Sequence, residues 1–207
     1  MSIVLVGSTS GSCTLQEQAV AGTTTLTLPT TSGTLITTAS SGQSIPRAAL
    51  PVGSVLQVIS TTKPDTFTMS GQTPTAITGL TATITPTSAT SNILIMVTIG
   101  GYAQGSGQGR FILTKASSTI SGAVGDTAGS RISDTFTISG PTSGAPQIVG
   151  GITYLDSPGT TSSTTYGVTV SSNDAGQPIY INRSNADTDN SGHQRNISTI
   201  TVMEIAA

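Results

Sequence analysis

Charged residues are scarce in this 207-residue chain: they form 8% of the sequence, whereas an average protein has about a quarter. Only seven residues are Lys or Arg, and the formal net charge is −2. Nucleic-acid binding depends on neutralising phosphates with Lys and Arg, so the composition argues against a DNA- or RNA-binding protein. The sequence has no basic cluster for a membrane surface and no apolar run long enough to cross a bilayer, so we expect no membrane insertion.

Cysteine, tryptophan and helix-forming residues are also scarce. The single cysteine, Cys13, excludes an internal disulfide framework and a cysteine-based zinc site. The sequence has no Trp, two Glu, two Lys and no sustained apolar period of 3.6 residues, which argues against a helical protein. We predict no cofactor, because no motif for one is present.

Serine and threonine are abundant: 29 Ser and 39 Thr form about a third of the sequence. From residue 53 onward, Thr alternates with apolar residues in short runs. Such alternation gives a strand one buried and one outward face, and Thr suits the outward face because it is β-branched and keeps a hydroxyl for water. We therefore predict an all-β protein with an antiparallel β-sandwich over residues 53–207. The clearest runs are 66–69, 80–85, 135–138 and 165–170.

Residues 1–52 differ from this pattern. Single apolar residues recur among Thr, Gly and Pro, and Glu17 is the only charged residue before Arg47. The segment predicts short strands and turns, and it is too poor in apolar residues to fold as a separate domain. We expect an extended attachment segment that becomes ordered on another protein; a floppy N-terminal arm is the alternative.

Two predicted strands are apolar on both faces. Residues 92–99 are almost continuously apolar, and both parities of residues 197–205 carry apolar side chains. One face of each strand belongs to the sandwich, and nothing else in the chain covers the other face, so a further copy is the simplest cover. We therefore predict an obligate oligomer with its interface along the last strand. The candidate interface residues are Ile197, Ile200, Val202, Met203, Glu204 and Ile205.

Glu204 is the exception among the acidic residues, because most of the others lie in predicted turns. Carboxylates in turns do not predict the facing pair that glycoside hydrolysis requires. A carboxylate within a buried strand needs a charged or hydrogen-bonding partner. The candidate partners are Arg110, Arg131 and Arg183.

The polar stretch 185–195 holds the residue types that catalysis or metal binding would use. His193 is the only histidine, but no nucleophile-elbow pattern accompanies it, so we predict no catalytic residues. Residues 187–192 match the first half of a calcium loop, but Ser198 stands where the bidentate Glu is required. We predict a polar tip loop and no metal site; a weak ion site completed by a neighbouring subunit is the alternative. The candidate surface residues are Asp187, Asp189, Asn190, His193 and Arg195.

Several stretches carry a family likeness when they are taken in order. They are 7–11, 14–16, 20–29, 31–35, 41–51, 154–158, 165–166, 181–183, 187–190 and 198–205. Those up to residue 51 resemble the start of virion proteins of marine and cyanobacterial tailed phages. The later stretches resemble the terminal knob of phage fibres, with a C1q/tumour-necrosis-factor jelly roll. The resemblance implies a homotrimeric jelly-roll knob on the virion surface, attached to other virion proteins through residues 1–52, and it supplies no catalytic residues.

Three functions follow from these observations. The first is a non-enzymatic short fibre or spike whose knob contacts a glycan or protein of the host surface. The second is a capsid decoration or cement protein that stabilises the head. The third is a polysaccharide hydrolase, which the lack of paired strand carboxylates disfavours. We favour a non-enzymatic virion protein, and the fibre over the decoration protein.

Overall fold

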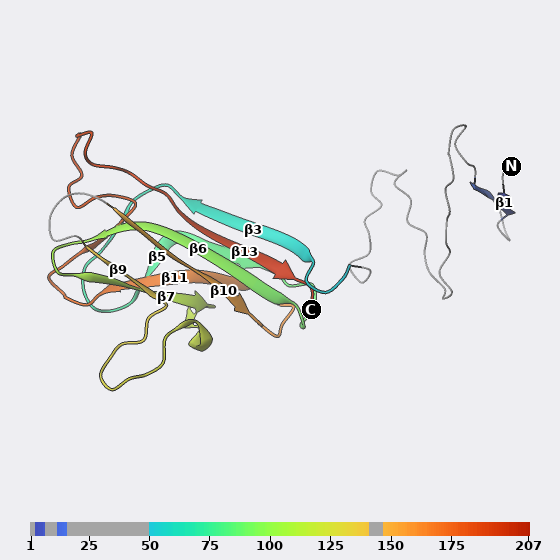
Figure 1. The fold of residues 1–207 in the computed structure, drawn as a ribbon, viewed down its shortest axis with the longest axis horizontal. Coiled ribbons are helices and arrows are strands. Elements are labelled where there is room, and N and C mark those ends of the chain that lie inside the picture. The colour runs from blue at the N-terminus through green and yellow to red at the C-terminus, as the bar shows by residue number, and fades with distance from the viewer. Residues whose placement is uncertain (1–2, 7–11, 16–49, 141–146) are drawn as a thin grey trace, which may run out of the picture. The chain divides into compact units, whose positions relative to one another are not determined.

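The computed structural model describes residues 3–6, 12–15, 50–140 and 147–207 (Figure 1). Contacts divide the chain into two units, Met1–Ile45 and Pro46–Ala207. In the first unit, β1 (Ile3–Val6) pairs antiparallel with β2 (Ser12–Leu15), with Ile3 opposite Leu15. Most of the predicted attachment segment, residues 16–49, lies outside the described residues.

The second unit is an antiparallel β-sandwich of two sheets, which confirms the predicted all-β fold. Sheet I contains β3 (Val55–Lys63), β4 (Phe67–Met69), β6 (Asn92–Ala103), β10 (Ile148–Asp156), β12 (Ile179–Ile181) and β13 (Ser198–Ile205). Sheet II contains β5 (Thr75–Ile84), β7 (Gln108–Lys115), β8 (Ser118–Thr119), β9 (Phe136–Ser139) and β11 (Thr164–Ser172). One 3-10 turn, η2 (Ser121–Ala123), follows β8.

The main strands pair in the nested order of a jelly roll. The first, β3, pairs with the last, β13, and β5 pairs with β11. Inside these pairs, β6 pairs with β10 and β7 pairs with β9. Successive pairs alternate between the sheets, so sheet I runs β3-β13-β6-β10 and sheet II runs β5-β11-β7-β9. Two sheets built from nested antiparallel pairs are a jelly roll.

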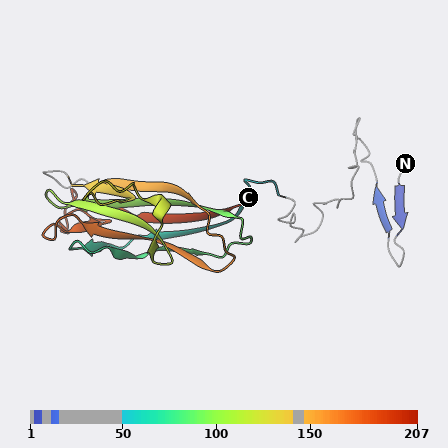
Figure 2. The same ribbon diagram turned by 90° about the horizontal axis from the view of Figure 1, so that it is seen from below.

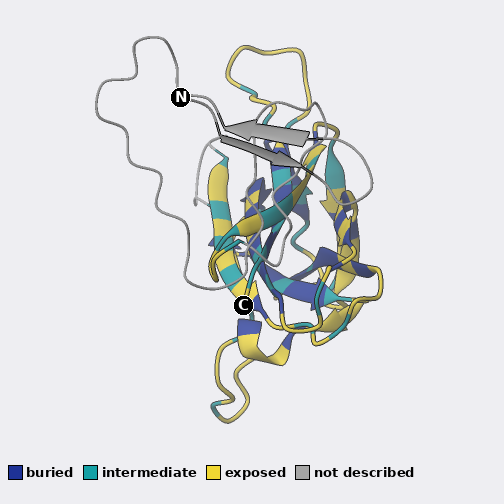
Figure 3. Cartoon of the chain, turned by 90° about the vertical axis from the view of Figure 1, so that its right-hand side faces the viewer, coloured by how far each residue is buried: buried dark blue, intermediate teal, exposed yellow. Residues whose placement is uncertain are grey.

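The core lies between the two sheets and follows from the alternation in the sequence. In β5, Leu80, Ala82 and Ile84 are buried, whereas Thr81 and Thr83 between them are exposed. Figure 3 shows the buried residues gathered between the sheets. Complete burial of one Ile, Leu or Phe side chain contributes about 1.5–3 kcal/mol. The largest fully buried side chains include Ile93, Ile95, Ile99, Phe111, Leu113 and Tyr166.

A polar tether joins the sheets where β10 ends. Asp156 of sheet I accepts a hydrogen bond from Tyr166 Oη at 2.7 Å and forms an ion pair with Lys115 Nζ at 3.0 Å. Tyr166 and Lys115 both belong to sheet II. Burial and the adjacent Asp156 carboxylate raise the pKa of Tyr166 far above its ordinary value. The Tyr166 hydroxyl therefore remains a hydrogen-bond donor, and the tether holds the two sheets together.

The two ends of the sandwich carry different connections (Figures 1 and 2). Leu50 and Ala207 lie at one end, together with the connections 85–91 and 157–163. The opposite end, called the loop end below, carries residues 70–74, 104–108, 173–178 and 182–197. The tip loop predicted from the sequence therefore lies at the end remote from Leu50.

Candidate functional site

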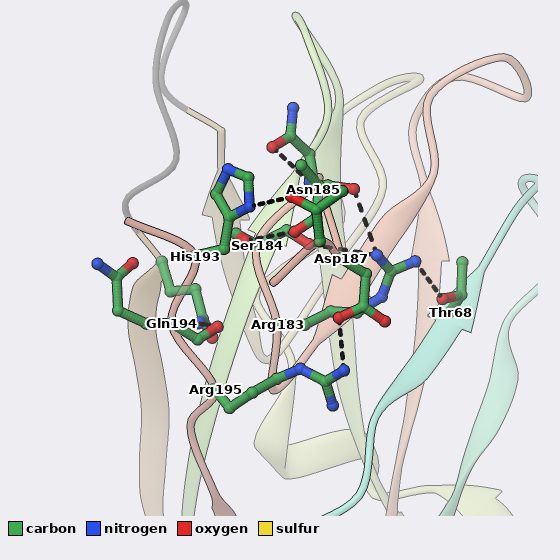
Figure 4. A network of polar contacts seen from close by, with 11 residues as sticks. Thr68, Arg183, Ser184, Asn185, Asp187, His193, Gln194 and Arg195 are labelled. Carbon is green, nitrogen blue, oxygen red and sulfur yellow. Dashed lines mark hydrogen bonds and ion pairs between the residues drawn. The ribbon is translucent and has the colours of Figure 1, made fainter. Parts of the chain in front are cut away.

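The tip loop, residues 182–197, leaves sheet I after β12 and returns to it at β13 (Figure 4). Arg195 forms an ion pair with Asp187, and Thr188 Oγ1 shares a hydrogen bond of 2.8 Å with His193 Nδ1. Beside these contacts the loop forms an open polar pocket of about 300 Å³. The structure thus brings the predicted tip residues together, since the pocket is lined by Asp187, Asp189, Asn190, His193 and Arg195.

The contacts of the tip loop do not form a catalytic triad. His193 Nδ1 contacts Thr188 Oγ1, whereas a triad requires a carboxylate at that ring nitrogen. The Asp187 carboxylate is occupied by Arg195. No group of three or more His, Cys, Asp or Glu side chains that could hold a metal occurs in the described part of the chain.

Asn182 holds the base of the tip loop. It is fully buried and has a φ of +60°, a left-handed conformation that Asn adopts more readily than most residues. Its Nδ2 donates to the carbonyl oxygens of Lys63 at 2.8 Å and Asp65 at 2.9 Å. Its Oδ1 accepts from Ser198 Oγ at 2.7 Å. Sequence reasoning missed this residue because two of its side-chain partners are more than 100 positions away, so no local pattern indicates them.

The outer faces of the two sheets differ in chemistry. The outer face of sheet II carries hydroxyls, with Thr81 and Thr83 on β5 and Thr165 on β11 exposed. Thr83 Oγ1 and Thr165 Oγ1 form a hydrogen bond of 2.8 Å across the two strands. This face is the Thr-rich outward surface that the sequence predicts, and it is suited to water.

The outer face of sheet I carries one apolar row beside rows that bear hydroxyls, such as Ser60 and Thr201. Val58, Met203, Leu94 and Leu155 lie opposite one another in one row across β3, β13, β6 and β10. Val58 is 52% exposed and Leu155 51% exposed, and no other described residue forms a layer over them. We call this surface the outer apolar face. Its members are Val58, Leu94, Met96, Leu155, Met203 and Ile205.

The predicted interface residues divide between the two sides of β13. Ile200, Val202 and Glu204 are fully buried inside the chain's own sandwich. The alternate residues Met203 and Ile205 point outward, because successive side chains of a strand face opposite ways. Ile197, directly before β13, is 57% exposed. Only Ile197, Met203 and Ile205 of the six are therefore placed to meet another molecule.

Glu204 is held by neutral donors, and the prediction of an arginine partner is wrong. Its Oε1 accepts from the backbone N and the Oγ1 of Thr87, each at 2.7 Å, and its Oε2 accepts from Gln57 Nε2 at 2.6 Å. Burial acts to raise the pKa of Glu204, but the hydrogen bonds outweigh it and lower the pKa to about 2. The Glu204 carboxylate therefore stays ionised without a cation. The arginines proposed as its partners were Arg110, Arg131 and Arg183.

Comparisons with known proteins do not identify a family. No protein-family model matches the chain, and no curated protein shows significant similarity to it. Among the described residues, no helix has the length and apolar character required to span a membrane. The two surfaces from which function can be argued are the outer apolar face and the loop end.

Proposed function

We propose that this protein is a non-enzymatic structural protein of a phage virion, a short homotrimeric fibre or spike. Residues 1–52 attach it to other virion proteins, and the jelly roll is displayed as a knob at the virion surface, where it contacts the host. The observation that carries the proposal is the outer apolar face of sheet I. The resemblance of the sequence to phage fibre proteins supports the setting.

The apolar row on the outer face of sheet I supports self-association. The outer face of sheet II is suited to water, because it carries exposed hydroxyls such as those of Thr81 and Thr83. Sheet I presents a row of apolar side chains in the equivalent place, including Val58 and Leu155. Contiguous apolar patches of this kind mark contacts between proteins. Each copy supplies the same face, so a closed symmetric assembly covers all of them, and a homotrimer satisfies this requirement.

The placement of the chain ends supports display of the loop end. Leu50, where the attachment segment enters the knob, lines one pocket with Thr87 and Ala207 and so lies at the end of the sandwich opposite the tip loop. Figure 2 shows the C-terminus at this end. Attachment through the residues before Leu50 leaves the loop end as the part of the knob farthest from the attachment point. A host receptor would therefore meet the loop end first.

The first test is the oligomeric state. We expect the wild-type chain to be a trimer at micromolar concentration by light scattering, and the double variant Met96→Asp, Met203→Asp to be a monomer. Two carboxylates placed in an apolar interface each lose hydration worth several kcal/mol. The matched control, Thr81→Asp with Thr83→Asp, adds the same charges to the outer face of sheet II and is expected to remain a trimer. Circular dichroism shows that both variants are folded, and a wild-type monomer would contradict the proposal.

The second test is the location of the protein on the particle. Immunogold labelling with an antibody to residues 53–207 is expected to mark the tail of the phage that carries the protein. Purified protein is expected to compete with that phage for adsorption to its host. Label on the head would instead support the capsid decoration protein, and label on neither part would refute a virion role.

A further inference from the structure

Carboxamide side chains gather at the loop end of the knob. The segment 50–207 contains seven Gln residues, and all except Gln57 lie within or beside the loop-end connections. The connections at the opposite end, 85–91 and 157–163, contain no Gln or Asn and are rich in Ser and Thr. The two ends of one sandwich therefore present different hydrogen-bonding groups.

Five carboxamide residues form what we call the amide rim: four from three connections, Gln72, Gln104, Asn173 and Gln177, and Gln108 at the start of β7. Gln72 Nε2 donates to the carbonyl oxygen of Asn173 at 2.8 Å, and Asn173 Oδ1 accepts from the backbone N of Gln108 at 2.6 Å. Gln104 Oε1 accepts from Tyr180 Oη at 2.9 Å. These bonds link the β4–β5, β6–β7 and β11–β12 connections into one surface.

Gln177 packs closely on the glycine-rich β6–β7 connection. A Cβ at Gly105 would lie 2.8 Å from Gln177 Oε1, and one at Gly107 would lie 2.7 Å from Gln177 Cβ. Gly105 also has a φ of +59°, where a side chain is strained. The glycines therefore let the connection approach Gln177, and this packing restricts where the Gln177 amide lies before any ligand arrives.

The amide rim keeps hydrogen-bonding capacity for a ligand. The side-chain amides of Gln108 and Gln177 have no hydrogen-bond partner in the ranges that the structure describes, and only the carbonyl oxygen of the Gln104 amide is used. Each carboxamide offers two N–H donors and one carbonyl acceptor. Sugar hydroxyls both donate and accept, so neighbouring carboxamides match a pair of adjacent hydroxyls. Asp174 is the only charged residue in 70–74, 104–108 and 173–178, so these stretches supply no cation for an acidic sugar. The neighbouring Arg183 already contacts the Tyr180 ring and donates to Thr68 Oγ1.

We propose that the amide rim binds an uncharged polysaccharide. Tyr180 lies beside the rim, because its hydroxyl donates to Gln104, and its ring carries the Arg183 guanidinium 4.1 Å from its centroid. The inference rests on the proposed function for its setting, because it names the class of molecule that the displayed knob contacts.

Binding to oligosaccharides tests the inference with the full-length protein. The probes are immobilised oligosaccharides of neutral hexose and N-acetylhexosamine units, beside a set that carries uronic acid or sulfate groups. We expect binding to a neutral probe, measured afterwards by calorimetry with that oligosaccharide in solution. The double variant Gln108→Ala, Gln177→Ala is expected to bind at least about tenfold more weakly, which corresponds to 1.4 kcal/mol. The matched control, Thr161→Ala with Ser163→Ala, removes two exposed hydroxyls at the opposite end and is expected to bind as wild type.

Three results would overturn the inference. These are binding confined to acidic probes, binding to no probe, and equal binding by wild type and the rim variant. Thermal unfolding of the rim variant at the wild-type temperature shows that any loss of binding is local. The oligomeric state and the immunogold label do not depend on sugars. If the protein is a trimer and the immunogold label marks the tail, but the protein binds no neutral oligosaccharide, the amide rim is refuted as a glycan site and the proposed function still stands.

Discussion

Replacing Asn182 with alanine is expected to lower the free energy of unfolding of the knob by about 4 kcal/mol. The variant removes the side chain that bridges β3 and β13. It leaves the buried Ser198 Oγ and Lys63 carbonyl oxygen, and the part-buried carbonyl oxygen of Asp65, without their partner. It also puts alanine at a φ of +60°, which costs about 1 kcal/mol more than asparagine or glycine there. Urea denaturation at one fixed protein concentration measures the loss.

Two further variants separate the causes. Asn182→Gly removes the side chain but accepts the left-handed backbone, so it is expected to be about 1 kcal/mol less damaging than Asn182→Ala. Asn185→Ala, in the exposed part of the same loop, is expected to change stability by less than about 0.5 kcal/mol. If Asn182→Ala cost no more than Asn185→Ala, the buried hydrogen bonds would not be what holds the loop base.

Loss of the Glu204 carboxylate is expected to have the second largest effect, and this effect depends on pH. The pKa of Glu204 is about 2 in the folded chain, below the ordinary value of 4.5. The ionised carboxylate therefore stabilises the fold fully above pH 4.5, and this contribution is lost as the pH falls from 4.5 toward 2. Glu204→Gln is expected to cost about 2–3 kcal/mol at pH 7 and little at pH 2. Thermal or urea unfolding between pH 2 and pH 7 shows the difference.

A compensating change provides the control. The amide that Glu204→Gln introduces turns an N–H donor toward Gln57 Nε2, which is also a donor. Adding Gln57→Glu restores an acceptor opposite that donor but loses the hydrogen bond from Gln57 Nε2 to the carbonyl oxygen of Thr85, so it is expected to recover only part of the loss at pH 7. The hydrogen bond from Lys63 also lowers the pKa of Asp65, so both Asp65 and Glu204 contribute to the pH dependence of wild-type stability. If the free energies of unfolding of wild type and Glu204→Gln differed by the same amount at every pH from 2 to 7, the ionised Glu204 carboxylate would not be the source of the pH dependence.

The sandwich could be predicted from the sequence because its strands alternate clearly. Leu80, Ala82 and Ile84 are buried in β5, as their spacing between threonines indicates. Other strands give weaker signals. In β10, Gly150 and Gly151 interrupt the pattern, and β12 has only three residues, Ile179–Ile181. The pairing of β3 with β13 joins residues more than 130 positions apart, which no local pattern can indicate.

The candidate sites could be predicted only where they are contiguous in the chain. The tip loop is one polar stretch, so its residues can be grouped from the sequence, and they line one pocket. The amide rim is built from three separate connections and the start of β7, and Gln57 meets Glu204 across 147 positions, so neither has a signal in sequence spacing. In β13, alternation separates Val202 from Met203, but it does not by itself tell which side faces the core.

The base of the tip loop allows the sequence of the loop to vary during evolution. Arg183 and Arg195 form an antiparallel bridge, and the backbone N of Asn196 donates to the carbonyl oxygen of Asn182 at 3.2 Å, so the two stems are joined before the chain departs. The residues between Arg183 and Arg195 add no strand to either sheet. Ser184 is fully buried, whereas residues 187–192 are exposed. We expect insertions and new sequences within 187–192 to leave the sandwich intact, which makes this stretch the natural place for diversification and for grafting a foreign peptide.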